Sequence, residues 1–178
     1  VVQEEAEPEL PSPMDTLFKE VKKMDRPVEI ALLLPFLTDR IDEEAMSISE
    51  KSQPALHFFH GIELALDSIR RDSKAVDMNI RVYDSQANPE TVYRLLSEDT
   101  LFRKADIIIG PWRSVNLEMV STIAGAREQV VFSPFSPNSS FVERNPRFLQ
   151  VNPSLKTHCE SITFHIRENH APQEVALV

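Results

Sequence analysis

Four short segments combine hydroxyl, aromatic and charged side chains in a pattern suited to holding a small polar ligand. They are Pro35–Asp39, Tyr83–Gln86, Gly110–Ser114 and Ser133–Pro137, and each follows an apolar run with the length of a strand. In an open parallel sheet, ligands bind beyond the carboxyl ends of the strands. Aromatic walls with a few placed polar groups are typical of small-molecule sites. The alternative is that these loops only cap helices and close the sheet.

Other chemistries find little support in the sequence. A phosphate-binding loop needs clustered glycines, whereas Gly61, Gly110 and Gly125 lie far apart. The Gly-x-Ser-x-Gly motif of serine hydrolases is absent. His57, His60 and Glu63 share one helical face, but no matching ligand pair accompanies them, so partly exposed helix residues are favoured over a metal site. We therefore predict a protein that is not an enzyme and uses no cofactor or metal.

Charge and hydropathy narrow the choice of partners. The net charge of −9 argues against nucleic acid, which requires basic residues to neutralise phosphates, and against docking on anionic lipid. No apolar run approaches the roughly 18 residues of a membrane-spanning helix. Cys159 is the single cysteine, and its helical spacing with Leu155, Ile162 and Ile166 predicts a thiol packed in a core.

Alternating strands and helices are expected to position the loops. The strands are predicted at Val28–Phe36, Asn79–Tyr83, Ala105–Ile109, Gln129–Phe132, Phe148–Val151 and Glu174–Val178. Helices are predicted from Pro54 to Asp72, from Pro89 to Lys104 and from Ser114 to Arg127, with Asn88 and Ser114 as the caps of the second and third. A fourth helix is predicted to begin at Pro153 and Ser154, with Leu155, Cys159, Ile162 and Ile166 on its inward side. This order predicts an α/β fold with an open, mostly parallel sheet and helices on both faces. The continuous apolarity of Val28–Phe36 makes it an inner strand.

The two ends of the chain differ from the middle. Residues 1–13 are acidic and rich in proline, which predicts a linker, and residues 14–24 have the pattern of a short helix with Leu17, Phe18 and Val21 on its apolar side. The last residues, 175–178, are apolar and are predicted to belong to one more strand. An uncovered final strand leaves an edge exposed, so the natural protein is expected to continue.

The order of several pieces resembles the receptor-family ligand-binding fold of type I periplasmic binding proteins. The pieces are Val28–Phe36, Gly61–Asp67, Val82–Ser85, Asp106–Pro111, Val131–Pro134 and Phe148–Pro153. The version here is most similar to envelope proteins in which this domain follows a peptidoglycan-binding LysM module.

This resemblance implies an arrangement of domains and a site. Residues 1–26 are then a linker with a possible short helix, 27–150 the first lobe, and 151–178 the crossover and the truncated start of a second lobe. The family's amino-acid binders hold their ligand with two loops of the first lobe, which correspond here to Trp112, Arg113 and Ser114 and to Ser133, Phe135 and Ser136. The location implied is the periplasm or cell envelope.

Two functions follow from the resemblance. The first is binding of a small polar ligand, such as an amino acid, between two lobes that close by a hinge. The second is a scaffold or regulator that acts on peptidoglycan or outer-membrane protein partners and carries a degenerate ligand site. The long acidic loop after Phe36 and the proline at position 137, where a hydroxyl residue is often found, are the features behind the second function.

Overall fold

The computed structural model describes residues 25–41, 47–71, 76–171 and 174, and its centre is a five-stranded sheet. All pairings are parallel, in the order β2-β1-β3-β4-β5. The strands are β1 Val28–Leu34, β2 Met78–Asp84, β3 Ile107–Ile109, β4 Val130–Ser133 and β5 Phe148–Gln150. The predicted linker, the helix over 14–24 and the acidic triplet 42–44 lie outside the described residues.

β1 is an inner strand, as its continuous apolarity predicts. Ile30 is paired with Ile80 of β2 on one side and with Ile107 of β3 on the other. Residues Ala31 to Leu34 are almost completely buried because helices cover both faces of the sheet at this point. The strand ends at Leu34, two residues earlier than predicted, where Pro35 has no N–H to continue the ladder.

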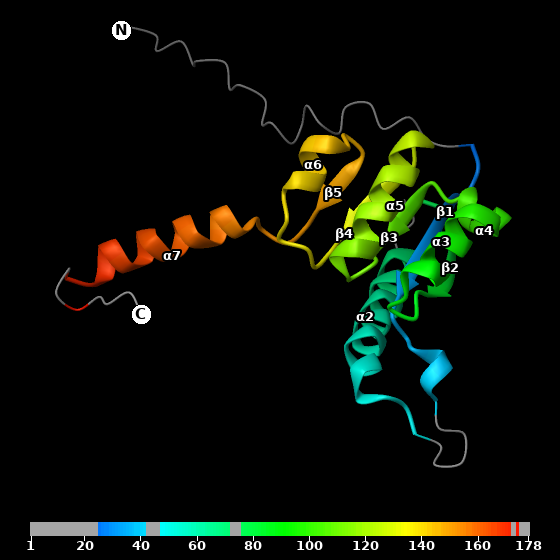
Figure 1. Cartoon of the computed structure of the whole chain (residues 1–178), viewed down its shortest axis with the longest axis horizontal. Helices are drawn as coiled ribbons and strands as arrows, with labels where there is room; N and C mark the ends of the chain where they lie inside the picture. Colours follow the sequence, from blue (N-terminus) through cyan, green and yellow to red (C-terminus); the bar gives the residue numbers. More distant parts are fainter. Residues whose placement is uncertain (1–24, 42–46, 72–75, 172–173, 175–178) are drawn as a thin grey trace, which may run out of the picture.

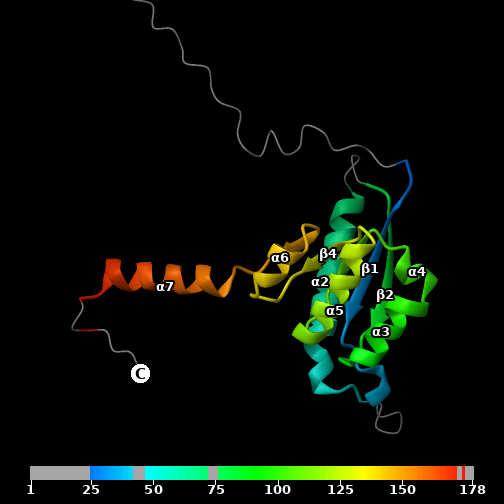
Figure 2. The same cartoon turned by 45° about the horizontal axis from the view of Figure 1, so that its top comes forward.

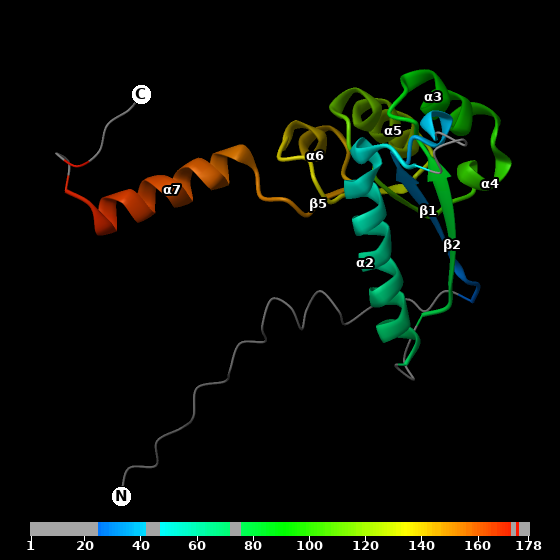
Figure 3. The same ribbon diagram turned by 90° about the horizontal axis from the view of Figure 1, so that it is seen from below.

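The helices form a layer on each side of the sheet. The described helices are α2 Gln53–Arg70, α3 Pro89–Glu98, α4 Thr100–Arg103, α5 Ser114–Ala126, α6 Ser140–Arg144 and α7 Leu155–Asn169, with 3-10 turns at Thr38–Arg40 and Glu50–Ser52, and all of these helices except α7 belong to the two layers. One face of the sheet packs against α3, α4, α5 and α6, and α2 is the single described helix that packs against the other. The predicted α/β architecture is confirmed, and Figures 1 and 3 show α2 standing opposite α3 and α5.

Capping explains where the helices begin, and it corrects two predictions. The Asn88 side chain accepts a hydrogen bond from the Glu90 N–H at 2.8 Å, as expected of an N-cap. Asp99 accepts from the Phe102 N–H at 2.7 Å and starts α4, so the single helix predicted to run to Lys104 is two helices. Ser114 is the first residue of α5 rather than its cap, because Arg113 occupies the N-cap position.

Helix α7 projects away from the sheet, which overturns the prediction for Cys159. Ser154 caps this helix by accepting from the Thr157 N–H at 3.1 Å. The helix has no buried residue, and Cys159, Leu155 and Ile162 are exposed. The helical period was correct, but none of the described elements covers the apolar stripe (Figure 2). The predicted strand at 174–178 lies outside the described residues except for Glu174.

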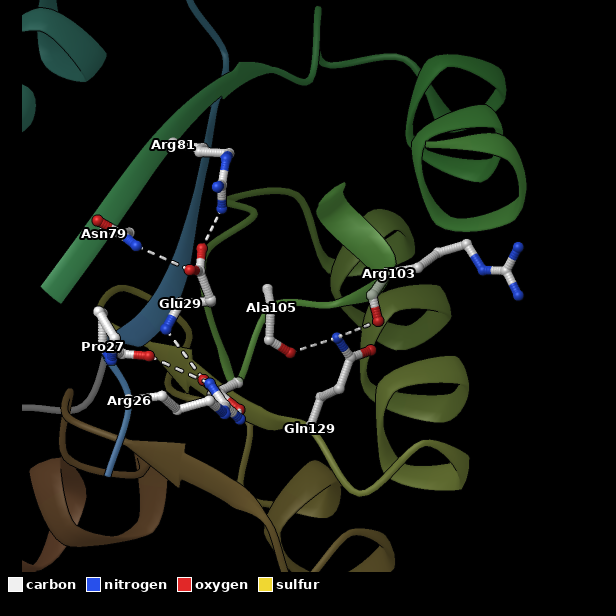
Figure 4. A network of polar contacts seen from close by, with 9 residues as sticks. Arg26, Pro27, Glu29, Asn79, Arg81, Arg103, Ala105 and Gln129 are labelled. Atoms are coloured by element: carbon white, nitrogen blue, oxygen red, sulfur yellow. Dashed lines mark hydrogen bonds and ion pairs between the residues drawn. The ribbon is translucent and has the colours of Figure 1, made fainter. Parts of the chain in front are cut away.

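The amino end of the sheet is joined by paired polar groups (Figure 4). Arg26 makes a two-bond ion pair with the Asp106 carboxylate at 2.6 and 2.7 Å, and the same carboxylate accepts from the Glu29 N–H at 2.9 Å. Glu29 also pairs with Asn79 and Arg81 of β2. These contacts fasten the start of β1 to both of its neighbours.

Among the described helices, none is long and apolar enough to cross a membrane.

Candidate functional site

The loops after β1, β2, β3 and β4 meet at one edge of the sheet, which we call the rim. The rim comprises residues 35–41, 84–88, 110–113 and 134–139 together with Ser133, the last residue of β4. Because β3 and β4 are parallel and adjacent, the two loops predicted to hold a ligand leave the sheet side by side. The Gly110 N–H donates to the Phe132 carbonyl at 3.0 Å and fixes this junction.

Gly110 is required where β3 passes into the rim. Its φ angle of 102° is one that other residues rarely adopt. A Cβ at this position would also overlap the carbonyl oxygen of Leu33 on β1. The close approach of these two backbones turns the chain so that Trp112 lies over the α2 side of the sheet, among the residues that surround Leu32 and Leu34.

An aromatic cluster forms the apolar part of the rim. The rings of Trp112 and Phe135 have their centroids 4.5 Å apart at 63°, and Phe58 of α2 lies 4.9 Å from Phe135 at 65°. Edge-to-face geometry of this kind is favourable for aromatic pairs. Phe135 is 38% exposed, so this cluster offers a ring surface to a ligand. The structure therefore brings together two of the predicted residues, Trp112 and Phe135.

Unpartnered polar atoms lie close in the chain to this cluster. Trp112 Nε1 and Ser133 Oγ are buried and have no hydrogen-bond partner among the described residues. Ser136 is also buried, and its Oγ accepts from the Asn138 N–H at 3.3 Å, which forms a turn in the loop. Side chains alternate along a strand, so Ser133 shares the face of Val131, the side covered by α5, whereas Trp112 packs on the α2 side.

Arg113 and Ser114 do not join the aromatic cluster. The Arg113 guanidinium donates to the Ala87 carbonyl at 2.8 Å and thereby ties the loop after β3 to the loop after β2. Ser114 is exposed at the start of α5. Of the six predicted residues, these two and Phe135 are exposed, whereas the other three are buried or half-buried.

Sequence reasoning missed two buried amides. Asn116 is 1% exposed, and both polar atoms of its side chain lack a partner among the described residues. Gln150 is half-buried, and its Oε1 is buried and unpartnered while its Nε2 donates to the Asn152 carbonyl at 2.8 Å; Gln150 is the register partner of Ser133. A signal for Asn116 was present, because it occupies the same helical stripe as the buried Val120 and Ala124. A buried amide without partners costs free energy unless a ligand or water satisfies it.

Asp84 organises the rim from the end of β2. Its carboxylate accepts hydrogen bonds from the backbone N–H groups of Phe36, Leu37, Thr38 and Gln86 and from the Thr38 hydroxyl, at 2.7–3.2 Å. Burial by itself would raise the pKa of Asp84, but the hydrogen bonds outweigh it and hold the pKa below its usual value. The sequence analysis included Asp84 in the segment Val82–Ser85 but assigned it no function.

The histidine face of α2 shows an ordinary surface pair. His60 Nδ1 lies 2.9 Å from a carboxylate oxygen of Glu63, and both side chains are exposed, as is His57. In the part of the chain that the structure describes, no group of three or more histidine, cysteine, aspartate or glutamate side chains is arranged to hold a metal ion.

The fold is that of solute-binding proteins of transporters. An ABC transporter substrate-binding protein from Desulfitobacterium hafniense is similar over 80% of this chain and 39% of its own, with 17% identity and a TM-score of 0.60. A solute-binding protein from Rhodopseudomonas palustris, in complex with 3,4-dihydroxybenzoic acid, is similar over 72% of this chain and 32% of its own, with 15% identity and a TM-score of 0.57.

A third similar structure binds an aliphatic amino acid. It is the branched-chain amino acid transporter substrate-binding protein of Streptococcus pneumoniae in complex with isoleucine, with 11% identity, a TM-score of 0.54, and coverage of 72% of this chain and 34% of that one. The chain thus spans 32–39% of the length of these structures. By sequence, it matches no protein-family profile and no curated protein.

Proposed function

We propose that this chain is the first lobe, with the start of the second, of a non-catalytic protein that binds a small polar ligand between two lobes. The observation that carries the proposal is the rim, where Trp112 and Phe135 form an aromatic wall at the carboxyl ends of parallel strands. Support comes from the shared fold, because proteins with it include binders of isoleucine and of a hydroxylated benzoic acid. The proposed boundaries are 27–150 for the first lobe and 151–178 for the crossover.

The chemistry of the rim favours a small carboxylate with an apolar part. Phe135, with Trp112 and Phe58 behind it, offers ring faces and edges to an aliphatic or aromatic group. Polar groups of the ligand are proposed to meet Ser114, Ser136 and the unpartnered Ser133 hydroxyl, while Arg113 supplies positive charge at the rim. An amino acid with an apolar side chain has both features.

One lobe is expected to bind such a ligand weakly. A two-lobed protein removes the ligand from water on both sides, whereas one lobe leaves half of it solvated. A hydrogen bond that only replaces one to water contributes roughly 1 kcal/mol, and the loss of several weakens affinity by orders of magnitude. The chain alone should therefore bind in the millimolar range, and submicromolar binding would contradict the proposed lobe boundary.

Trp112 provides the test, because it is the single tryptophan of the chain and lies in the proposed site. We expect leucine, isoleucine, phenylalanine or benzoate, titrated to roughly 10 mM, to change its fluorescence in a saturable way. Phe135→Ala should weaken this response. Tyr93→Ala is the matched control, because Tyr93 is an exposed aromatic residue of α3 on the other face of the sheet.

A saturable response that is the same in the wild type, Phe135→Ala and Tyr93→Ala would show that the rim is not the site. The absence of any response across the panel would favour the envelope scaffold with a degenerate ligand site.

The proposal includes a periplasmic location and attachment to a peptidoglycan-binding module. The attachment is suggested by residues 1–13, which are acidic and rich in proline.

A further inference from the structure

A large groove lies between α2 and the edge strand β2, away from the proposed ligand site. Its volume is about 920 Å³. It is lined on the α2 side by Phe59, His60, Glu63, Leu64, Leu66, Asp67, Ile69 and Arg70, and on the β2 side by 76–78, Ile80 and Val82. The β2 side is apolar apart from Asp77. A groove of this kind next to a sheet edge is a surface for another element to cover.

The groove exists because α2 is the single described helix on its face of the sheet. Ile80 and Val82 point to this face, since they are the register partners of Ile30 and Leu32, and Leu32 packs against the α2 side. Val82 is nevertheless 46% exposed, and Leu64 on the neighbouring wall is 73% exposed. Covering such side chains is worth about 25 cal/mol per Å² of apolar surface.

We propose that residues 14–24 of this chain dock in the groove as a helix. Their sequence places apolar residues at helical spacing in one stripe, at Met14, Leu17, Phe18, Val21 and Met24. Eleven helical residues extend roughly 16 Å. The groove wall from Phe59 to Arg70 has twelve helical residues and a length of roughly 18 Å, so the two match in length as well as in apolar character.

The chain enters the sheet beside the groove, which makes its own segment the favoured occupant. The Val28 N–H donates to the carbonyl oxygen of Asp77, a groove residue, at 2.9 Å. Arg26 is fixed by its ion pair with Asp106. Residue 24 is therefore within a few residues, or roughly 14 Å of extended chain, of the groove. So short a tether gives the segment an effective concentration in the millimolar range or above, which a second copy of the chain at micromolar concentration does not reach.

The charges and the direction of the chain agree with this placement. The groove carries three carboxylates, two of which already have a basic neighbour on α2, in the pairs His60–Glu63 and Arg70–Asp67, so that only Asp77 has none there. The segment carries three lysines against Asp15 and Glu20, so with neutral histidine the groove has an excess of negative charge and the segment an excess of positive charge. Both α2 and the docked segment would end near the amino end of β2, so they run parallel. This direction sets Val21 opposite Asp67 and Phe18 opposite Leu64.

Disulfide trapping in the complete chain tests this register. The chain carries Cys159→Ser, so that the two introduced cysteines are its only thiols. With oxidised glutathione added, Val21→Cys and Asp67→Cys should form an intramolecular disulfide. The two thiols are oxidised, and one oxidised glutathione is reduced to two molecules of glutathione. Trapping requires Cα atoms within about 7 Å. We expect a rate about tenfold or more above two controls, Val21→Cys with Tyr93→Cys on the opposite face, and Leu10→Cys with Asp67→Cys outside the segment.

A second pair of variants tests the contacts rather than the register. Leu17→Asp with Phe18→Asp should reduce the trapping rate to that of the controls and raise the hydrogen exchange of 59–70, whereas Leu10→Asp should change neither. Leu64→Lys should reduce trapping by repelling the lysines, and its exposed position leaves the fold intact. Equal rates in all three cysteine pairs would overturn the proposal. Disulfides that form mainly between molecules, at a rate that falls on dilution, would assign the groove to a second copy instead.

Discussion

The two ends of the parallel sheet treat polar groups in opposite ways. At the amino end, Arg26, Glu29 and Asp106 are each paired by short hydrogen bonds within the fold (Figure 4). At the carboxyl end, five of the six buried polar side-chain atoms that lack a partner among the described residues are found, in Trp112, Asn116, Ser133 and Gln150. The sixth is Gln129 Oε1 at the amino end. The amide nitrogens of Gln129 and Gln150 are both bonded, to the carbonyls of Ala105 and Asn152.

Backbone conformation shows the same difference. Of the five described residues with positive φ, four lie at the rim, namely Leu37, Gln86, Ala87 and Gly110, and one, Glu128, lies at the amino end. Positive φ at residues other than glycine costs free energy and persists where function or surrounding structure requires it. The polar groups at the amino end are therefore paired within the fold, whereas the carboxyl end combines paired groups such as Asp84 with the buried atoms that lack a partner, and these unpartnered atoms are the ones expected to respond to a ligand. The following variants test this division.

The largest effect is expected at the rim backbone. Gly110→Ala should lower the free energy of unfolding by roughly 2–5 kcal/mol, because it adds a strained φ and an overlap with the carbonyl of Leu33. Gly61→Ala is the matched control. Gly61 lies inside α2 with nothing near its added Cβ, so alanine should stabilise by about 0.5–1 kcal/mol. Urea unfolding of both variants measures the difference, and equal values would show that the turn at Gly110 is not required.

At the amino end, Asp106→Asn should cost stability without affecting the rim. The substitution removes the charge that Arg26 binds through two bonds and weakens the acceptor of the Glu29 N–H. Hydrogen bonds to charged groups contribute about 1.5–3 kcal/mol, and partial exposure places the expected loss near the lower limit. Asp39→Asn, at an exposed rim aspartate, should change the urea midpoint little. If Asp106→Asn also changed the Trp112 fluorescence response to ligand, the two ends of the sheet would not be independent.

The sequence predicted the scaffold well and the rim only in outline. Strand β1 was recognisable because burial on both faces requires a continuous apolar run, and Asn88 with Pro89 marked the start of α3 by local chemistry. Both signals can be read from residues that are close together in the sequence. The parallel order of the strands followed from the alternation of strands and helices.

The contacts at the rim depend on residues far apart in the chain, which a single sequence does not reveal. Phe58 reaches Phe135 from α2, and Asp84 binds a loop 46 to 48 residues earlier. The same limit explains Cys159, whose helical spacing identified an apolar stripe but not what covers it. Periodicity predicts which side of an element is apolar, whereas packing decides whether that side is buried.

Asn116→Leu should raise the free energy of unfolding, in contrast to Asp106→Asn. The side chain of Asn116 is buried with both polar atoms unpartnered, and leucine of similar volume removes that cost. We expect a gain of about 1–2 kcal/mol in urea unfolding. The control is Ser121→Ala on the same helix, since Ser121 interacts with Asn145 and should lose stability. A loss of stability in Asn116→Leu would show that the amide is satisfied in the folded chain and belongs with the paired groups.

The smallest effect concerns the pH dependence that the rim receives from Asp84. Its pKa is held below the usual value of an aspartate because the hydrogen bonds that it accepts outweigh the effect of burial. A carboxyl group with a lowered pKa in the folded state contributes stability that is complete above the unfolded pKa. That stability is lost as the pH falls through the folded pKa, so the urea midpoint should decline from about pH 4 downward.

Thr38→Val tests this contribution at the rim with a matched control in Thr38→Ser. Valine removes the hydroxyl that donates to Asp84 at 2.7 Å but keeps the backbone N–H that donates at 2.8 Å, whereas serine keeps both donors. Valine should therefore raise the pKa of Asp84 towards its usual value and make the decline below pH 4 shallower. The site is exposed, so the change at pH 7 should stay below about 1 kcal/mol. Identical pH profiles for the valine and serine variants would assign the lowered pKa to the backbone donors alone. The rim loop after β1 would then be held by main-chain hydrogen bonds, as strands are, and would be less adjustable by a ligand than the rest of the rim.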